Sequence, residues 1–289
     1  MTPSAGPSVR PHALAFKAYE IEELADVYFF RPVGVVIAHA ARILGLSATQ
    51  LTVAGCLIGL AGGSLLYDER LGLWAFALLI VYGIFDSADG QLARMTGTES
   101  ELGRVLDGAG GYITHAAAYI AIVAGFLNRS GEVSIIAWAT LSAIANTAQA
   151  QMYDYHRTSY ATFAIKRIVV STEREPIDEG WARWLLRGYL AVQQRLIGRH
   201  GEVEAAIARR SPQGIVSEVD RARYRACFYW PVRGWNLLGD NTRFYAIGVL
   251  AWIHRLEWFF IFIVVPMNVA LAVLWLWQRR ADERFLAGP

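Results

Sequence analysis

The sequence predicts an all-α integral membrane protein built as a bundle of six transmembrane helices. The chain has 289 residues, of which 55% are hydrophobic and only 18% are charged, whereas soluble domains usually carry about a quarter charged residues. Several of its apolar stretches also reach the roughly 20 residues that a helix needs to cross the hydrocarbon core of a bilayer. The net charge of +2 gives no reason to expect nucleic-acid binding.

Six stretches are expected to form the membrane spans. Five are long and apolar, and the fifth in chain order is shorter and begins with Asp240 and Arg243. Tryptophans bracket the last stretch, which suits residues that sit at the two membrane interfaces. The expected spans are residues 47–66, 71–92, 103–127, 133–152, 237–253 and 258–277.

The basic residues predict how these spans are oriented. Arginines and lysines are concentrated before the first span, in the link between the second and third, between the fourth and fifth, and in the tail, whereas the opposite loops hold few. Because cytoplasmic loops carry the excess of Lys and Arg, both termini are expected in the cytoplasm. The few basic residues of the opposite loops are Arg70, Arg129 and Arg255.

Two amphipathic regions divide the chain into four expected parts. Residues 1–46 lack the apolar core of a signal peptide and are expected to form a leader and an amphipathic surface helix, "ELADVYFFRPVGVVIAHAARIL". Residues 47–156 hold spans one to four, and residues 236–289 hold spans five and six with the tail. Residues 157–235 are a cytoplasmic helical insertion, which either covers the bundle as a hairpin or takes part in binding a substrate.

Three acids stand at the cytoplasmic edge of this apolar chain. Asp86 and Asp89 are three residues apart and so share one helix face, and Asp107 follows after a short link. Carboxylates that converge at a membrane boundary repel one another unless a cation neutralises them. Hard divalent ions prefer such all-oxygen ligands, so the three acids predict a site for one or two Mg²⁺ or Mn²⁺ ions.

Small residues surround these acids, and an arginine follows them. Gly90, Ala93 and Gly103 leave room for a large ligand to approach the helices, and Arg94 offers a forked donor suited to phosphate. Together with a cation they describe a phosphate or diphosphate site. The alternative is an ordinary helix interface in which the acids pair with Arg94 and Arg104.

The same residues resemble the signature of the CDP-alcohol phosphotransferases, D-x2-D-G-x2-A-R-x8-G-x3-D-x3-D. Asp86, Asp89, Gly90, Ala93, Arg94, Gly103 and Asp107 all stand at the required spacing. The resemblance extends to the expected six helices, to the placing of the motif across the second and third of them, and to the surface helix that precedes them. It does not cover residues 157–235.

The resemblance implies a membrane enzyme of phospholipid or related lipid synthesis. It would transfer a substituted phosphate from a CDP-alcohol donor to an acceptor alcohol and release CMP. Asp86, Asp89 and Asp107 would hold the metal, Gly90, Ala93 and Gly103 would make room for the nucleotide, and Arg94 would contact it. Members of the family often form dimers, which makes a homodimer one expected assembly. The sequence names neither alcohol.

The chain departs from the family pattern at its last acid, which is Gly111 here. That acid is the family's proposed general base, and a positioned base is worth about 10²–10⁴-fold in rate. His115, one helical turn further on, is either a stand-in base or a packing contact. Other readings are an acceptor that is already ionised, or a catalytically impaired homologue that binds metal or CDP-alcohol in a structural or regulatory role. A transporter or channel is the remaining class of protein for a bundle of six membrane helices.

Polar residues also gather at the end of the fourth expected span, in "NTAQAQMYDYHR". They are expected at the depth of the acids, where they either line an acceptor pocket or solvate the helix end. They are Asn146, Gln149, Asp154, His156 and Arg157.

Overall fold

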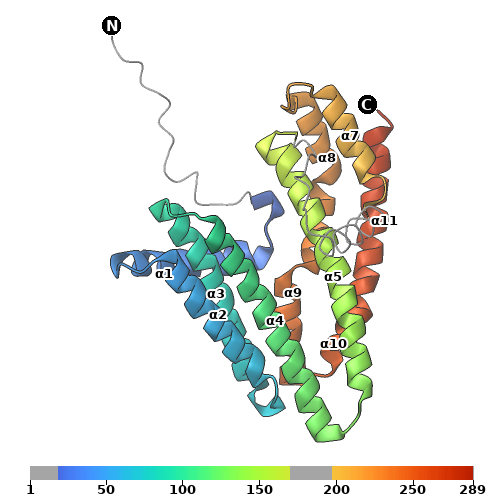
Figure 1. Cartoon of the computed structure of the whole chain (residues 1–289). Coiled ribbons are helices and arrows are strands. Elements are labelled where there is room, and N and C mark those ends of the chain that lie inside the picture. Colours follow the sequence, from blue (N-terminus) through green and yellow to red (C-terminus); the bar gives the residue numbers. More distant parts are fainter. Residues whose placement is uncertain (1–18, 170–196, 289) are drawn as a thin grey trace, which may run out of the picture. The chain divides into compact units, whose positions relative to one another are not determined.

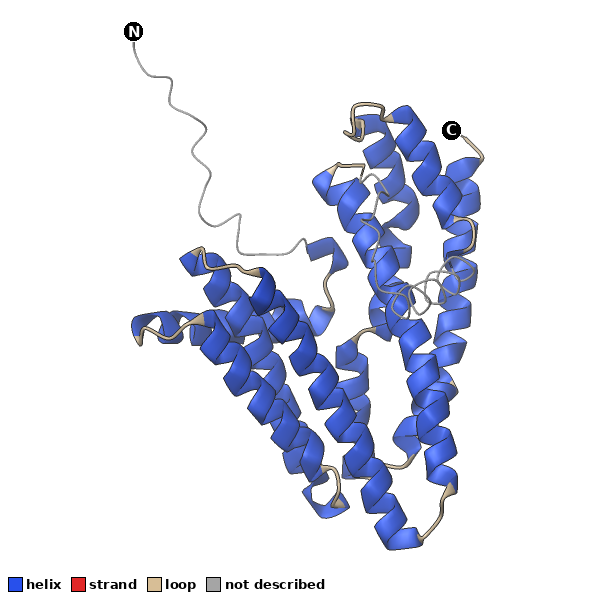
Figure 2. Cartoon of the chain, in the orientation of Figure 1, coloured by secondary structure: helices blue, strands red, loops and turns tan. Residues whose placement is uncertain are grey.

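The chain is helical throughout the part that the computed structural model describes, residues 19–169 and 197–288. Within these ranges there is no strand, only an isolated bridge between Ile168 and Ile215. The predicted all-α class is therefore confirmed (Figure 2). Residues 1–18 of the expected leader and residues 170–196 of the expected insertion lie outside the described residues. The principal helices are α1 (Arg31–Ile43), α2 (Ala48–Leu65), α3 (Gly72–Thr96), α4 (Glu101–Ser130), α5 (Ser134–Tyr160), α7 (His200–Arg210), α8 (Glu218–Trp235), α9 (Asp240–Trp252), α10 (Trp258–Val264) and α11 (Pro266–Leu286).

Four of the six expected spans have the length and apolar composition to cross a membrane among the described residues. They are Ala48–Leu65, Glu69–Thr96, Val105–Ser130 and Trp258–Leu286. Helix α9, which covers the fifth expected span, has 13 residues and is about 20 Å long, whereas the hydrocarbon core is about 30 Å thick. Helix α5 is long enough but carries Asn146, Gln149 and Gln151 in its length. The fourth and fifth spans, the orientation and the surface position of α1 stay predictions.

The described residues fall into two compact units. The first unit contains the residues up to Ala139 together with Arg243–Phe259, and the second contains those of Thr140–Thr242 and from Phe260 onward. This division passes through α5, α9 and α10, so it differs from the four parts expected from composition. The acids of the signature lie in the first unit, and the described part of the insertion lies in the second.

In the first unit, α2 packs lengthwise against both α3 and α4 (Figure 1). Glycines on α2 allow this close approach. A Cβ on Gly62 would stand 3.0 Å from the Leu78 Cβ of α3, and one on Gly63 would stand 3.0 Å from the Ala118 nitrogen of α4. Small residues at helix interfaces let membrane helices gain packing contacts that lipid cannot offer. The α2 sequence "AGCLIGLAGG" therefore sets the spacing of the helices that carry the acids.

Local signals fix where these helices begin and end. Ser47 caps α2 in a capping box with Gln50, whose backbone nitrogen donates to the Ser47 hydroxyl at 3.2 Å. Helix α3 ends at Gly97, which takes the left-handed conformation (φ 66°). Ser100 then caps α4 and accepts a hydrogen bond from the Gly103 nitrogen at 3.0 Å. The link between the two motif helices is thus only a few residues long.

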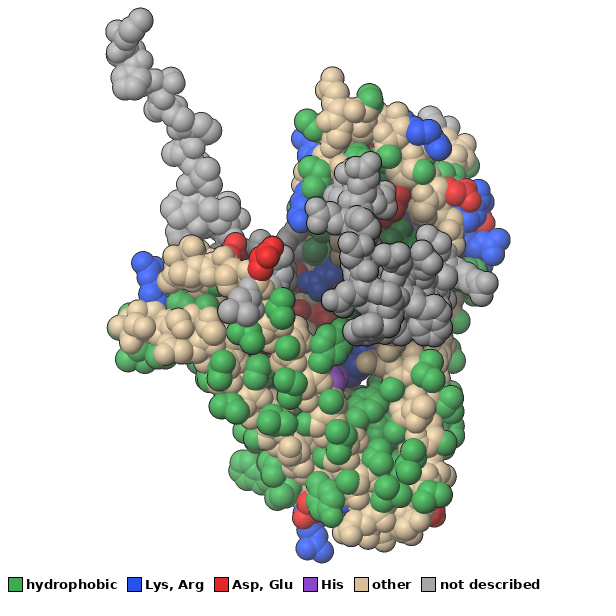
Figure 3. All heavy atoms as spheres, in the orientation of Figure 1, with side chains coloured by type: hydrophobic (Ala, Val, Ile, Leu, Met, Phe, Trp, Pro, Cys, Tyr) green, Lys and Arg blue, Asp and Glu red, His purple; other side chains and the backbone are tan. Residues whose placement is uncertain are grey.

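Hydrophobic side chains cover the outer surface of α2, α3 and α4 (Figure 3). Such a broad apolar surface is unusual for a soluble monomer and is expected for helices that face lipid. The exposed residues include Val53, Leu57, Leu73, Trp74, Tyr112, Ile113 and Ile120.

In the second unit, α11 packs against α7 and α8. Polar contacts also join α5 to the last helices, because the Gln149 amide nitrogen donates to the Ile263 carbonyl and to the Asn268 side chain, each at 3.0 Å. Gln149 is fully buried. Its position suits helix packing, which is neither of the two roles expected for the polar end of the fourth span.

Candidate functional site

The three acids of the signature line one small hollow in the first unit. Asp86 and Asp89 reach it from α3 and Asp107 reaches it from α4, and its remaining walls are Thr52, Gly55, Cys56 and Tyr82. Asp86 and Asp107 are exposed, whereas Asp89 is only 5% exposed. The sequence placed these acids together from spacing alone, and the fold brings them to the same hollow.

Asp89 is the buried acid of this set. Its Oδ2 atom has no hydrogen-bond partner among the described residues. The Thr52 side chain lies against the carboxylate, but its hydroxyl also donates to the Ala48 carbonyl at 3.1 Å. A buried carboxylate oxygen without a partner is costly, and a cation or a donor on a ligand would satisfy it.

The donor set of the hollow fits a hard divalent cation. Carboxylate and hydroxyl oxygens are the ligands that Mg²⁺ and Mn²⁺ prefer, and Asp86, Asp89, Asp107 and Thr52 supply them. Within the described ranges, however, no group of three or more His, Cys, Asp or Glu side chains is arranged to hold a metal ion. The metal therefore stays a prediction that rests on the chemistry of the donors.

The small residues around the acids have distinct surroundings. A Cβ on Gly108 would meet nothing within 4 Å, so this face of α4 is open beside Asp107. A Cβ on Gly110 would collide with the Cys56 sulfur, so that glycine is needed for close packing of α2 and α4. Gly103 lies in the first turn of α4, where its nitrogen donates to the Ser100 cap. The expected role of Gly90, Ala93 and Gly103 in making room for a nucleotide stays a prediction.

Arg94 follows the acids by one helical turn on α3. Its side chain is half-buried and folds back along the helix, with Nη1 3.4 Å from the place that a Cβ on Gly90 would occupy. Its Nε has no hydrogen-bond partner among the described residues, and its charge acts on the Asp89 carboxylate. A guanidinium beside the acids, with an Nε donor that is not bonded to the described residues, suits recognition of phosphate.

Gly111 leaves space where the family pattern has its last acid. A Cβ on Gly111 would stand 3.6 Å from the Tyr82 hydroxyl, which is an ordinary contact distance. Tyr82 itself lines the hollow of the acids. A side chain at position 111 would therefore begin next to a residue that lines the hollow, and its Cβ would have room there.

His115 lies one turn beyond Gly111 and packs against α9. Its Nδ1 is 2.9 Å from the Gly111 carbonyl, and because a carbonyl only accepts, Nδ1 carries the proton. The ring stacks on Phe244, with 5.4 Å between ring centroids and 25° between ring planes. These contacts suit a packing role. They also leave Nε2 as the acceptor nitrogen of the neutral ring, which is the form that a base requires.

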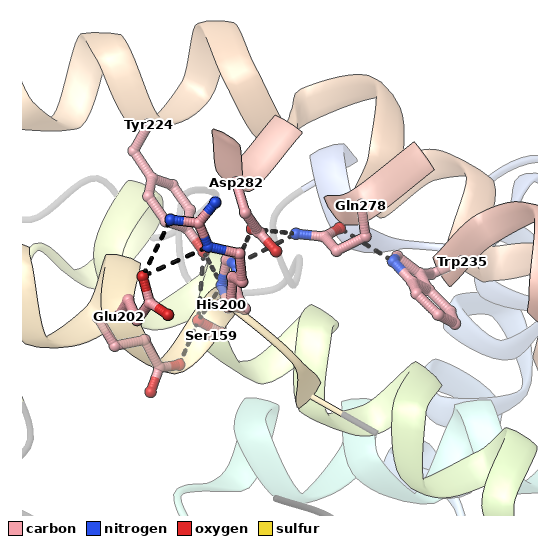
Figure 4. A network of polar contacts seen from close by, with 9 residues as sticks. Ser159, His200, Glu202, Tyr224, Trp235, Gln278 and Asp282 are labelled. Atoms are coloured by element: carbon pink, nitrogen blue, oxygen red, sulfur yellow. Dashed lines mark hydrogen bonds and ion pairs between the residues drawn. The ribbon is translucent and has the colours of Figure 1, made fainter. Parts of the chain in front are cut away.

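A buried polar network in the second unit was not foreseen from the sequence (Figure 4). His200 of α7 is 1% exposed, and its Nδ1 donates to Asp282 of α11 at 2.7 Å. Gln278 also donates to Asp282, at 3.2 Å, and accepts from the Trp235 indole at 3.1 Å. The network joins α5, α7, α8 and α11. Its members are far apart in the chain and match no motif, so only their shared polarity in apolar surroundings could have indicated them.

The hydroxyl side of this network is buried, beside a small hollow that His200 and Tyr224 line. His200 Nε2 lies 3.1 Å from both the Ser159 and the Tyr224 hydroxyls. Ser159 is 5% exposed and directs its proton to Glu204 at 2.8 Å, whereas a nucleophilic serine would direct it to the histidine. Burial raises the pKa of the Tyr224 hydroxyl well above its ordinary value, so the hydroxyl stays neutral. The arrangement therefore fastens helices together and is not a hydrolytic triad.

The four apolar helices suggest a membrane protein, and the hollow in its first unit is lined by three acids. Residues 45–173 match the model of the CDP-alcohol phosphatidyltransferase family, so this segment is similar to that family. The resemblance seen in the signature is thus confirmed for the segment that contains α2 to α5. This family comprises membrane phosphotransferases of lipid synthesis, which use a CDP-alcohol donor and an alcohol acceptor and generally depend on divalent metal. No curated protein and no solved structure matches the chain.

Proposed function

We propose that this protein is a metal-dependent CDP-alcohol phosphotransferase, which transfers a phosphatidyl or phosphoalcohol group to an acceptor alcohol and releases CMP. The observation that carries the proposal is the hollow lined by Asp86, Asp89 and Asp107. Its buried carboxylate oxygen lacks a partner, and the spacing of its acids is that of the matched family. Both termini and the hollow would face the cytoplasm, in agreement with the distribution of basic residues.

Each residue of the hollow has a role in this reaction. Asp86, Asp89 and Asp107 would hold one or two Mg²⁺ or Mn²⁺ ions. A bound ion would neutralise the charge that develops on the departing CMP. Arg94 would bind a phosphate oxygen through its guanidinium group. The open face at Gly108 would admit the nucleotide next to Asp107.

Release of CMP tests this function directly. Purified protein in lipid or detergent is incubated with a panel of CDP-alcohols, Mg²⁺ or Mn²⁺ and a membrane lipid extract, and CMP is measured. We expect metal-dependent CMP release with at least one donor. CDP-alcohol binding without any release of CMP would instead support the second candidate, a homologue that binds its ligands but does not turn over. Gly111 favours that candidate, because the family's base is missing there.

The variant Gly111→Asp measures what the missing acid costs. A Cβ at this position has room beside the Tyr82 hydroxyl, so we expect the variant to fold and to raise kcat by about 10-fold or more, since a positioned base is worth about 10²–10⁴-fold. The isosteric variant Gly111→Asn is the control, because it adds the same volume without a base. Equal rates for the two variants and the wild type would show that deprotonation does not limit turnover.

The variant His115→Phe separates the two roles of His115. Phenylalanine keeps an aromatic ring against Phe244 and removes both ring nitrogens. We expect kcat at neutral pH to stay within about threefold of the wild type, because the contacts of His115 suit packing. The loss of a general base would instead cost about 10²–10⁴-fold. A decrease of about 100-fold with an unchanged melting temperature would assign the base to His115.

A further inference from the structure

Helix α1 crosses α3 at the turn that carries the acids. Asp86 and Asp89 point to the hollow, whereas Ala88 and Leu92 of the same turns are fully buried against α1 and α2. The apolar contacts on this side come from Ala38 and Ala41 of α1 and Leu51 of α2. One face of α3 therefore carries the expected ligands, and the adjacent face is attached to α1.

Gln91 makes the polar contact between these two helices. It is 3% exposed, and its Nε2 donates to the Arg31 carbonyl of α1 at 3.2 Å and to the Ser87 hydroxyl at 3.1 Å. The Arg31 side chain is itself fixed by a buried ion pair with Glu22 at 2.7 Å. A buried amide whose nitrogen makes two hydrogen bonds holds its neighbours more specifically than apolar packing does.

Gly34 of α1 fits directly over this contact. A Cβ on Gly34 would stand 2.8 Å from the Gln91 Nε2 and 2.9 Å from the Ser87 Oγ, closer than real Cβ contacts. Neither side chain can easily move away from such a Cβ, because Gln91 is buried and Ser87 is hydrogen-bonded to it. Glycine is thus required for α1 to lie at its present distance from α3.

These contacts lie next to the two acids in the chain. Ser87 follows Asp86 directly, and Gln91 is two residues after Asp89. Successive residues of a helix rise by about 1.5 Å and point about 100° apart, so any rotation or shift of this turn against α1 moves both carboxylates. The distance between α1 and α3 consequently sets where Asp86 and Asp89 stand in the hollow.

We propose that Gln91 is a positioning residue for the acidic site, and that it acts with Gly34 and the Arg31 carbonyl to fix the carboxylates of Asp86 and Asp89. The inference rests on the proposed function, since it assigns Gln91 to the metal-binding turn of that site. Gln91 itself does not line the hollow.

Direct metal binding tests this role. Mn²⁺ affinity is measured by titration calorimetry on the purified full chain, together with the melting temperature and the Mg²⁺ concentration for half-maximal CMP release. The variant Gln91→Met keeps the side-chain volume and removes the amide, and Gly34→Ala introduces the close contact. For both, we expect Mn²⁺ affinity to fall by about 10-fold, the scale seen when groups that orient metal ligands are removed.

A double variant and a matched control make the result specific. Gly34→Ala combined with Gln91→Ala removes the closest atom that the new Cβ would meet, the Gln91 Nε2, and leaves the Ser87 contact. We therefore expect its loss of affinity to be smaller than the product of the losses measured for Gly34→Ala and Gln91→Ala singly. Gly201→Ala is the control, because it adds the same methyl to a helix where nothing lies within 4 Å. We expect Gly201→Ala to bind Mn²⁺ as the wild type does.

The outcomes separate the two proposals. Lowered melting temperatures with Mn²⁺ affinities within twofold of the wild type would overturn the positioning role and leave Gln91 a purely structural residue. A wild-type protein that binds Mn²⁺ but releases no CMP would overturn the proposed enzyme, while the affinities of the variants still decide the role of Gln91. A wild-type protein that binds no Mn²⁺ would overturn both.

Discussion

The substitution Asp89→Asn is expected to reduce CMP release by about 1,000-fold, which corresponds to about 4 kcal/mol of transition-state stabilisation. Asparagine has the shape of aspartate and therefore fills the same buried space, but it carries no charge to hold a cation. The change removes the one acid of the hollow that is buried and has an oxygen without a partner. The measurement is kcat with saturating donor over a range of Mg²⁺ concentrations.

Stability distinguishes a functional from a structural role for Asp89. A buried carboxylate without full hydrogen bonding costs free energy in the folded state, so we expect the melting temperature of Asp89→Asn to equal or exceed that of the wild type. Asp68→Asn serves as the control, because Asp68 is an exposed acid that caps a short helix ahead of α3, away from the hollow. A melting temperature that falls in parallel with activity would show that Asp89 holds the helices together.

The second large effect is expected at Asp282, where alanine should lower the free energy of unfolding of the second unit by about 3–5 kcal/mol. Asp282 is 1% exposed and accepts from His200 at 2.7 Å and Gln278 at 3.2 Å. Removal of one partner of a buried pair leaves the other without compensation, and this accounts for the size of the effect. The measurement is thermal or denaturant unfolding in detergent.

Two further variants test the cause of this effect. Glu283→Ala changes the neighbouring acid, whose contacts with Arg279 and Arg199 are at the surface, and exposed pairs contribute only about 0–1 kcal/mol. Leucine at both His200 and Asp282 replaces the whole pair by apolar groups, a change that often leaves the folding stability nearly unchanged. We therefore expect neither variant to lower the free energy of unfolding by much. A double leucine variant as unstable as Asp282→Ala would show that packing, and not the lost partner, causes the effect.

Most of the helical architecture could be predicted because it depends on local patterns. The first three expected spans lie within one or a few residues of α2, α3 and α4, since long apolar runs and their capping residues Ser47, Gly97 and Ser100 are adjacent in the chain. The interval 237–253 stays a prediction as a span. Helix α9 covers Asp240–Trp252 of it, and these 13 residues make a helix shorter than the membrane core is thick.

That the three acids lie together could be predicted for the same reason, whereas the residues that hold their helix in place could not. Asp86, Asp89 and Asp107 fall within one short segment, so their spacing alone brings them to one end of a helix pair. The partners that hold this segment are distant in the chain. Gln91 reaches a carbonyl 60 positions away, and no periodicity connects the two.

The sequence by itself determined the helical class, the apolar stretches and the acidic signature, because each depends on the residue types within a few helical turns. Only the tertiary structure decided that Asp89 is the buried acid, that Gly34 lies against Gln91, and that His200 and Asp282 form a buried pair across 82 positions. Burial and hydrogen bonding between distant helices depend on how those helices pack. Packing is set by the sum of many weak contacts and leaves no fixed spacing in the chain.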